Sequence, residues 1–237
     1  KGGATDILNR GISDIVAKNT GWKFNIKNVP GDAGVIGTKQ VYDLPADGHT
    51  LLMAAENPST YDALGISDVT FKDFNCVHLI GYIAPVVVVN PASRFNTFKD
   101  IIDEAKANPG SITIADTGKG GIGWTASAFI NEITGARFQP MTYESGTATK
   151  NAVINGECDF AVCLISEGLD DFKSGKAKMV SIIALDKDKD FPDVPTIVEE
   201  YPELYSLKFD EEKEKLLKNK IIYKILYFIY LFKNKYK

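Results

Sequence analysis

Arginine, histidine and cysteine are all scarce in this chain of 237 residues. Its three arginines, Arg10, Arg94 and Arg137, cannot build a dense basic patch. Nucleic acid binding, which depends on clustered Lys and Arg at the phosphates, is therefore not expected. Residues 1–209 carry 19 basic against 27 acidic residues, which makes this part of the chain acidic. Any anion that the protein holds should thus be held by backbone dipoles rather than by arginine.

The few histidines and cysteines also limit the chemistry. His49 and His78 belong to no metal-binding or catalytic motif, so we expect no zinc site, no histidine-dependent nucleophile and no cofactor. Cys76, Cys158 and Cys163 show no CxxC spacing, and an odd number leaves at least one unpaired. Buried apolar thiols are the favoured interpretation, with a Cys158–Cys163 disulfide as the alternative.

No hydrophobic run is long enough to cross a membrane. The longest, Ile221–Phe232, has twelve residues and contains Lys224, whereas a spanning helix needs about 20 apolar residues. Lys1 already lies at a glycine turn, so we expect no export signal within this sequence. Residues 210–237, with eight lysines and neither Gly nor Pro, predict a non-native or out-of-frame extension that packs poorly or is disordered. A helix on a membrane surface is the alternative.

Short hydrophobic segments alternate with glycine and proline turns along the rest of the chain. A first helix is predicted to start at an N-cap, Thr5 or Asp6, and to stop at Gly21. Its apolar residues share one face: Leu8, Ile12, Ile15 and Val16. Further helices are predicted at about 35–44, 98–107, 124–134, 147–155 and 166–173.

The predicted strands lie at 24–29, 50–55, 74–80, 85–90, 111–115, 138–143, 159–163 and 179–185. The valine run in 85–90 predicts a strand that is buried on both faces. After Pro91 strands and helices alternate, which indicates parallel α/β sheets.

Three glycine turns each open a predicted helix: Gly2–Asp6, Thr117–Gly123 and Tyr143–Thr147. A helix N-terminus leaves amide groups unpaired and carries partial positive charge, which suits a carboxylate or a phosphate. Glycine also lets a ligand approach the backbone closely. Each turn alone is explained equally well as a tight connection, but three hydroxyl-bearing turns favour an anion site.

Another interpretation attaches to the middle turn. Gly118, Gly120 and Gly123 spell G-x-G-x-x-G between a predicted strand and a helix, and Glu144 ends the next strand. This outline is typical of a dinucleotide site, so a nucleotide-binding α/β enzyme that uses Gly118–Gly123 is the alternative function. No catalytic His or Lys arrangement follows the motif. Asp6, Asp116 and Asp159 show no paired spacing and are expected in capping or solvated roles.

A series of short motifs runs along the chain in a fixed order. The motifs are GGATD at 2–6, NVPGDAGVIG at 28–37, PADGHTLL at 45–52, KDF at 72–74, AKANPG at 105–110, TGKG at 117–120, YESG at 143–146, NGECD at 155–159 and FPDVPT at 191–196. Their joint order, over about residues 1–207, resembles the Bug/TctC-type solute-binding proteins of tripartite tricarboxylate transporters.

The resemblance implies an α/β, periplasmic-binding-protein-like fold of type II, with a ligand closed between two lobes. It implies a protein without catalytic activity that captures a di- or tricarboxylate, an acidic amino acid or an aromatic acid. The captured acid would pass to membrane permease subunits. We expect a monomer in the periplasm, or a lipoprotein anchored to the outside of the membrane, that binds no nucleic acid.

On this resemblance, residues 1–86 form the first lobe, which is continued by about 187–209, and residues 87–186 form the second. The strand that the family has before its GG turn is absent here, and the resemblance ends after Leu207. The first lobe is therefore expected to lack pieces at both ends.

The resemblance also carries over ligand contacts. In the first lobe these are Ala4, Thr5 and Asp6, and Asn57 is expected to face the same cleft. Asp6 would bind an amine, a water or a backbone N–H, because it repels a carboxylate. The second lobe is expected to contribute Thr117, Gly118, Gly120, Ser145, Gly146, Thr147 and Asp159. Trp124 stands where the family usually has His.

Overall fold

The computed structural model describes residues 3–78, 80–81 and 83–202. They form two compact units that divide between Ile80 and Gly81. We call residues 3–80 the first unit and residues 81–202 the second unit, and each is described by itself. The predicted extension at 210–237 and its apolar run lie outside the described residues.

This division differs from the predicted one, which sets the boundary at residue 86 and returns the chain to the first lobe from about 187. Residues 187–202 belong instead to the second unit. There Thr196 forms a parallel bridge with Ile182, and the short helix α8 (Ile197–Glu200) contacts α4 (Phe98–Ala107).

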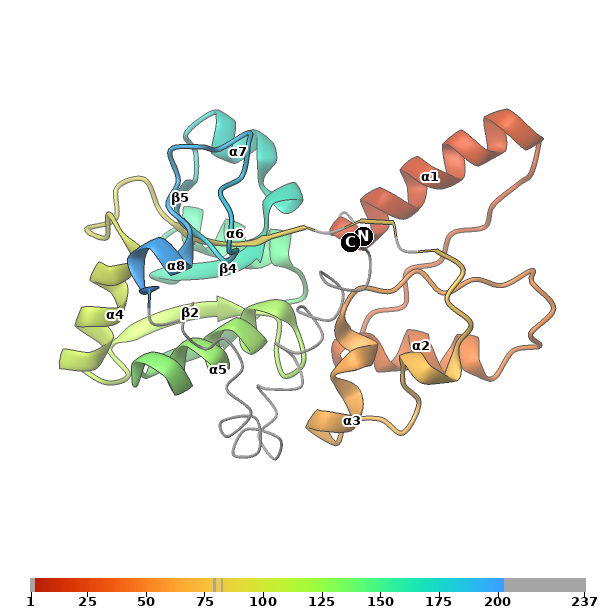
Figure 1. Cartoon of the computed structure of the whole chain (residues 1–237), viewed down its shortest axis with the longest axis horizontal. Coiled ribbons are helices and arrows are strands. Elements are labelled where there is room, and N and C mark those ends of the chain that lie inside the picture. The colour runs from red at the N-terminus through yellow and green to blue at the C-terminus, as the bar shows by residue number, and fades with distance from the viewer. Residues whose placement is uncertain (1–2, 79, 82, 203–237) are drawn as a thin grey trace. The chain divides into compact units, whose positions relative to one another are not determined.

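The second unit is built on one five-stranded sheet, in the order β3-β2-β4-β1-β5 (Figure 1). The strands are β1 (Pro85–Val89), β2 (Ile112–Asp116), β3 (Phe138–Thr142), β4 (Phe160–Leu164) and β5 (Lys178–Ile182). β2 pairs in parallel with both β3 and β4, as predicted, but β1 runs antiparallel to β4 and β5. A continuous valine run is buried equally well in either direction, so its pattern carries no information about orientation.

Helices cover both faces of this sheet (Figure 1). On one face α4, α5 (Ile122–Thr134) and α8 pack on alternate strand residues such as Val87, Ile114 and Phe160. On the other, α6 (Gly146–Ile154) and α7 (Leu169–Lys173) pack on the residues between them, such as Val88 and Ala161. Val86 to Val89 are 0% exposed, which confirms the strand predicted to be buried on both faces.

The first unit consists of α1 (Ala4–Thr20), α2 (Val35–Tyr42), α3 (Tyr61–Leu64) and 3₁₀ turns at Asp32–Gly34, Asn57–Ser59 and Phe71–Asp73. The strands predicted at 24–29, 50–55 and 74–80 are wrong, since the described part of this unit contains no strand. A strand exists only where a neighbouring backbone supplies its hydrogen bonds, and alternating hydrophobicity cannot supply that neighbour.

Helix α1 ends as predicted and begins two or three residues earlier than predicted. Gly21 closes it in the left-handed conformation, with φ of 75° and its amide bonded to the carbonyl of Ala17. Its N-cap is Gly3 rather than Thr5 or Asp6. The apolar face faces solvent, because Leu8, Ile12 and Ile15 are 44%, 37% and 61% exposed within the described structure.

Two of the three cysteines match the predicted buried thiols. Cys158 and Cys163 are buried and free, whereas Cys76 is exposed. Among the residues that the structure describes, no helix combines the length and apolar character needed to span a membrane.

Candidate functional site

The loop between β2 and α5 is shaped by glycine. Gly118 and Gly120 adopt positive φ, 78° and 89°, which glycine reaches without strain. Gly121 is the N-cap of α5, and a Cβ there would lie 1.9 Å from the hydroxyl oxygen of Thr117. This close approach places the Thr117 hydroxyl against the start of the helix. No side chain among the described residues caps α5, so its first amides, at residues 122–124, have no partner within the helix.

Asp116, the last residue of β2, joins this loop to the next one. Asp116 is 1% exposed, and its Oδ1 accepts hydrogen bonds from the Gly118 amide (2.9 Å) and the Thr142 hydroxyl (3.1 Å). Its carbonyl accepts from the amide of Tyr143 (2.8 Å). The Gly118 amide is therefore engaged inside the protein, and Gly118 contributes the turn rather than a donor.

The loop between β3 and α6 ends in a serine that caps α6. Ser145 is the N-cap of α6, and its Oγ accepts a hydrogen bond from the amide of Ala148 (3.2 Å). Gly146 begins the helix and is buried, and a Cβ there would lie 1.9 Å from Oε2 of Glu167. Thr147 follows, half-buried. A carboxylate of the chain itself thus lies against the first residue of α6.

The two loops leave the same edge of the sheet. β2 and β3 are parallel neighbours, and their last residues, Asp116 and Thr142, are register partners. The structure therefore brings together most of the residues expected from the second lobe: Thr117, Gly118, Gly120, Ser145, Gly146 and Thr147.

Asp159 is not part of this group. It directly precedes β4, and its Oδ2 accepts from the amide and the hydroxyl of Thr113 (2.8 and 2.7 Å). Thr113 lies near the start of β2, about 13 Å along the strand from Thr117. Because β2 and β4 are parallel, Asp159 lies at the opposite edge of the sheet from the two loops. Asp159 therefore links the starts of β2 and β4, and its Oδ1 lies 3.8 Å from Nη1 of Arg94. We no longer expect it to contact the ligand.

The expected contacts of the first unit lie in the first turn of α1 and in a short turn. Ala4 and Asp6 are buried and Thr5 is half-buried. Oδ1 of Asp6 accepts from the side-chain Nδ2 of Asn28 (2.9 Å) and pairs with Nη2 of Arg10 (2.9 Å). The charge of Asp6 is thus balanced inside the unit.

Asn57 begins a 3₁₀ turn rather than following a strand. Its carbonyl accepts from both the amide and the hydroxyl of Thr60 (2.9 and 2.8 Å). In the second unit Trp124 is half-buried in the first turn of α5, and Glu144 is exposed.

Tyr143, the first residue of the β3–α6 loop, contacts two side chains that precede β4. The hydroxyl of Tyr143 donates to Oε2 of Glu157 (3.2 Å) and lies 3.5 Å from Sγ of Cys158. The contact with Cys158, followed by burial and the nearby Glu157 charge, raises the pKa of Tyr143 well above its ordinary range. Burial likewise raises the pKa of the Cys158 thiol. Both groups are therefore neutral at physiological pH.

Asp116, Tyr143, Glu157 and Glu167 acquire these roles only in the folded chain. Asp116 carries one sequence signal, its position directly before a Thr-Gly turn, where Asp commonly bonds the amide two residues on. The contact of Glu167 with Gly146 joins residues 21 apart and leaves no pattern in the sequence.

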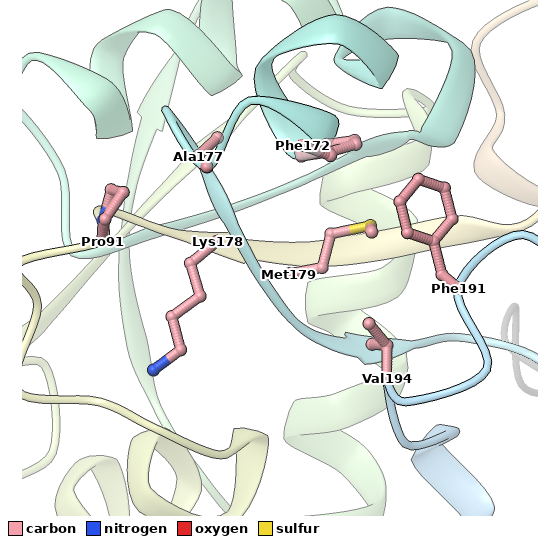
Figure 2. A pocket seen from close by; sticks show the side chains of 8 residues that line it. Pro91, Phe172, Ala177, Lys178, Met179, Phe191 and Val194 are labelled. Atoms are coloured by element: carbon pink, nitrogen blue, oxygen red, sulfur yellow. The ribbon is translucent and has the colours of Figure 1, made fainter.

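A separate hollow of about 340 Å³ lies beside β5 (Figure 2). Phe172, Met179, Phe191 and Val194 make its wall apolar. Nζ of its one lysine, Lys178, donates to Oδ1 of Asn96 (2.8 Å). None of the expected ligand contacts lines this hollow.

Known proteins share this sequence pattern. Residues 8–206 match the family model TctC, the tripartite tricarboxylate transporter family receptor. BugT of Bordetella pertussis is 27% identical over 209 residues, which are 85% of this chain and 64% of BugT. The chain thus spans less than two thirds of that relative's length.

Solved structures share the fold. MatC from Rhodopseudomonas palustris, with bound malate, has a TM-score of 0.77 at 23% identity, over 84% of this chain and 68% of MatC. The periplasmic binding protein BugD has a TM-score of 0.73 at 22% identity, over 85% of this chain and 68% of BugD. The fold is therefore that of periplasmic binding proteins, as predicted, and the chain belongs to the tripartite tricarboxylate transporter receptor family.

Proposed function

We propose that this chain captures a small carboxylate outside the cytoplasm and delivers it to the permease subunits of a tripartite tricarboxylate transporter. One observation carries the proposal. Two glycine-shaped loops leave one edge of the sheet side by side, and the helix that follows the first has no side-chain cap. The bound malate of MatC supports an acid as the ligand.

The binding chemistry rests on backbone amides and hydroxyls. Micromolar affinity requires about −8 kcal/mol, and a hydrogen bond to a charged group contributes roughly 1.5–3 kcal/mol. Three or more such bonds are therefore needed. Residues 122–124 offer amides, and Thr117 offers a hydroxyl at the same helix end. The family resemblance adds Thr5 and the first turn of α1.

The ligand class that fits is a di- or tricarboxylate, an acidic amino acid or an aromatic acid. The proposed site contains no arginine, so the backbone recognises the carboxylate while the rest of the ligand is selected by shape. We place the protein in the periplasm as a monomer.

We propose that the chain is a binding protein and not an enzyme. The family and the structural neighbours are solute-binding proteins. The loop at Gly118–Gly123 has glycine geometry that would also suit a dinucleotide, because a Cβ on Gly123 would lie 3.3 Å from Asp116. NAD therefore belongs among the test ligands.

Isothermal titration calorimetry tests the proposal. The full chain is titrated with malate, succinate, citrate, glutamate, benzoate and NAD. We expect micromolar binding of at least one acid, weakened about tenfold by Thr117→Val and by Thr5→Val, each of which removes one hydroxyl. Binding of NAD without any acid would replace this function with the nucleotide-binding one.

A further inference from the structure

The carboxylate of Asp116 contacts Gly118 in the first loop of the proposed site and Thr142, the strand residue from which the second loop leaves. We propose that Asp116 is a positioning residue that holds the β2–α5 and β3–α6 loops in one fixed arrangement. Its effect on ligand binding rests on the proposed function, whereas its effect on the loops does not.

The contacts reach both loops from a single oxygen. Oδ1 accepts from the amide of Gly118, two residues ahead, and from the hydroxyl of Thr142, which ends the neighbouring strand. The backbone carbonyl of the same aspartate accepts from Tyr143. A shift of either loop would break bonds that the other loop shares, so the two should move together.

Asp116 is buried, so its carboxylate depends on neighbouring protein groups for its hydrogen bonds. Asp116 is 1% exposed, and the described residues form no ion pair with it. A buried charge without a cation requires hydrogen-bond donors and favourable dipoles. The first turn of α5 lies directly on Asp116, at Gly123, where a Cβ would be 3.3 Å from its Cα and Cβ. The first turn of α5 therefore packs closely on Asp116.

Substitution separates the hydrogen bonds from the charge. Asp116→Asn keeps an oxygen at the Oδ1 position and can still accept both bonds, whereas Asp116→Ala removes them. We expect Asp116→Ala to weaken binding of the acid identified by calorimetry about tenfold or more, because misplaced donors lose their alignment. Asp116→Asn should bind within about threefold of the wild type.

A second variant tests the link between the two loops without substituting Asp116. Thr142→Val removes only the hydroxyl donor at the end of β3. In ¹H–¹⁵N spectra of the ligand-free full chain, we expect it to shift the amide of Gly118, in the first loop. Thr134→Val is the matched control, because its hydroxyl donates to the carbonyl of Ile130 at the far end of α5 (2.7 Å). It should leave the Gly118 amide in place.

The binding measurements test the effect of Asp116 on the ligand, and the amide shifts test its effect on the loops. An unchanged Gly118 amide in Thr142→Val, or wild-type affinity in Asp116→Ala, would overturn the positioning role. If the wild type binds no acid at all, the proposed function fails and the amide shifts alone decide the role of Asp116. Should Asp116→Ala fail to fold, Thr142→Val, which preserves side-chain volume, decides it.

Discussion

Position 123 leaves room for little more than a hydrogen atom. A Cβ there would lie 3.2 Å from the carbonyl oxygen of Val162 and 3.3 Å from Asp116, both part of the sheet. Gly123→Ala should therefore push α5 away from β2 and β4 and lower the free energy of unfolding by about 1–3 kcal/mol. Thermal and urea unfolding, followed by circular dichroism, measure this loss.

Gly11→Ala is the control for that substitution. Gly11 lies within α1, and a Cβ there meets nothing within 4 Å. Alanine should therefore raise the free energy of unfolding by about 0.5–1 kcal/mol, because it restricts the unfolded chain and favours helix. Equal effects of the two substitutions would show that α5 is not packed tightly on the sheet.

A charged pair between α6 and α7 makes stability depend on pH. The ammonium group of Lys150, which is buried, bonds to the carboxylate of Asp171. This hydrogen bond holds the pKa of Asp171 below its ordinary value. Because the pKa is lower in the folded state, the pair stabilises the fold above the ordinary value of about 3.9. That stabilisation is lost as the pH falls from there through the lowered pKa.

Lys150→Met tests this pair. At pH 7 it should lower the free energy of unfolding by about 2–3 kcal/mol, because Asp171 loses its main partner. Below about pH 3.9 the difference between variant and wild type should shrink, because Asp171 is then protonated in the unfolded chain and the wild type loses the stability that its lowered pKa provides. Urea unfolding at pH 7 and near pH 3 measures it. A difference that is independent of pH would contradict the assigned ion pair.

At the scale of elements, α1 and α4 contrast in how their apolar residues are used. Ile15 on α1 is 61% exposed, whereas Ile101 on α4 is 0% exposed and lies in the core beneath the sheet. Ile15→Lys should change the free energy of unfolding by less than about 0.5 kcal/mol. Ile101→Ala should lower it by about 2–5 kcal/mol. A large loss from Ile15→Lys in urea unfolding would mean that the apolar face of α1 is covered.

The elements of the second unit could be predicted from the sequence because their patterns are local. Phe98–Ala107 has an apolar face and a Thr97–Asp100 capping box, and Val86–Val89 form a continuous buried run. The direction of β1 was not predictable, because it depends on which strand lies beside it. The same limit explains the first unit, where alternation at 24–29 predicted a strand but no described neighbour pairs with it.

The candidate site was predicted in part for a related reason. Glycine turns before helices are visible in the sequence, so the loops that contain Thr117 and Ser145 were predicted, and parallel strands bring these loops together. Asp159 was expected from the family resemblance alone, and its position directly before β4 places it at the other edge. The links that Asp116 and Glu167 form between loops depend on contacts far apart in sequence, and no spacing reveals them.

At the scale of the whole molecule, the net charge bears on how the proposed acid ligand is recognised. The chain belongs to the tripartite tricarboxylate transporter receptor family, and its residues 1–209 carry more acidic than basic groups. Long-range attraction therefore does not draw an acid to the protein. In the proposed function, short-range donation from helix amides therefore supplies the affinity for the acid.

Amide chemical shifts during a titration test that claim most directly. The ¹⁵N-labelled full chain is titrated with the acid that calorimetry identifies, and every resolved amide is followed. We expect the largest shifts at residues 122–124 and 146–147, at the starts of α5 and α6. Saturating shifts confined to the apolar hollow around Phe172 and Phe191, with those helix starts unmoved, would contradict it.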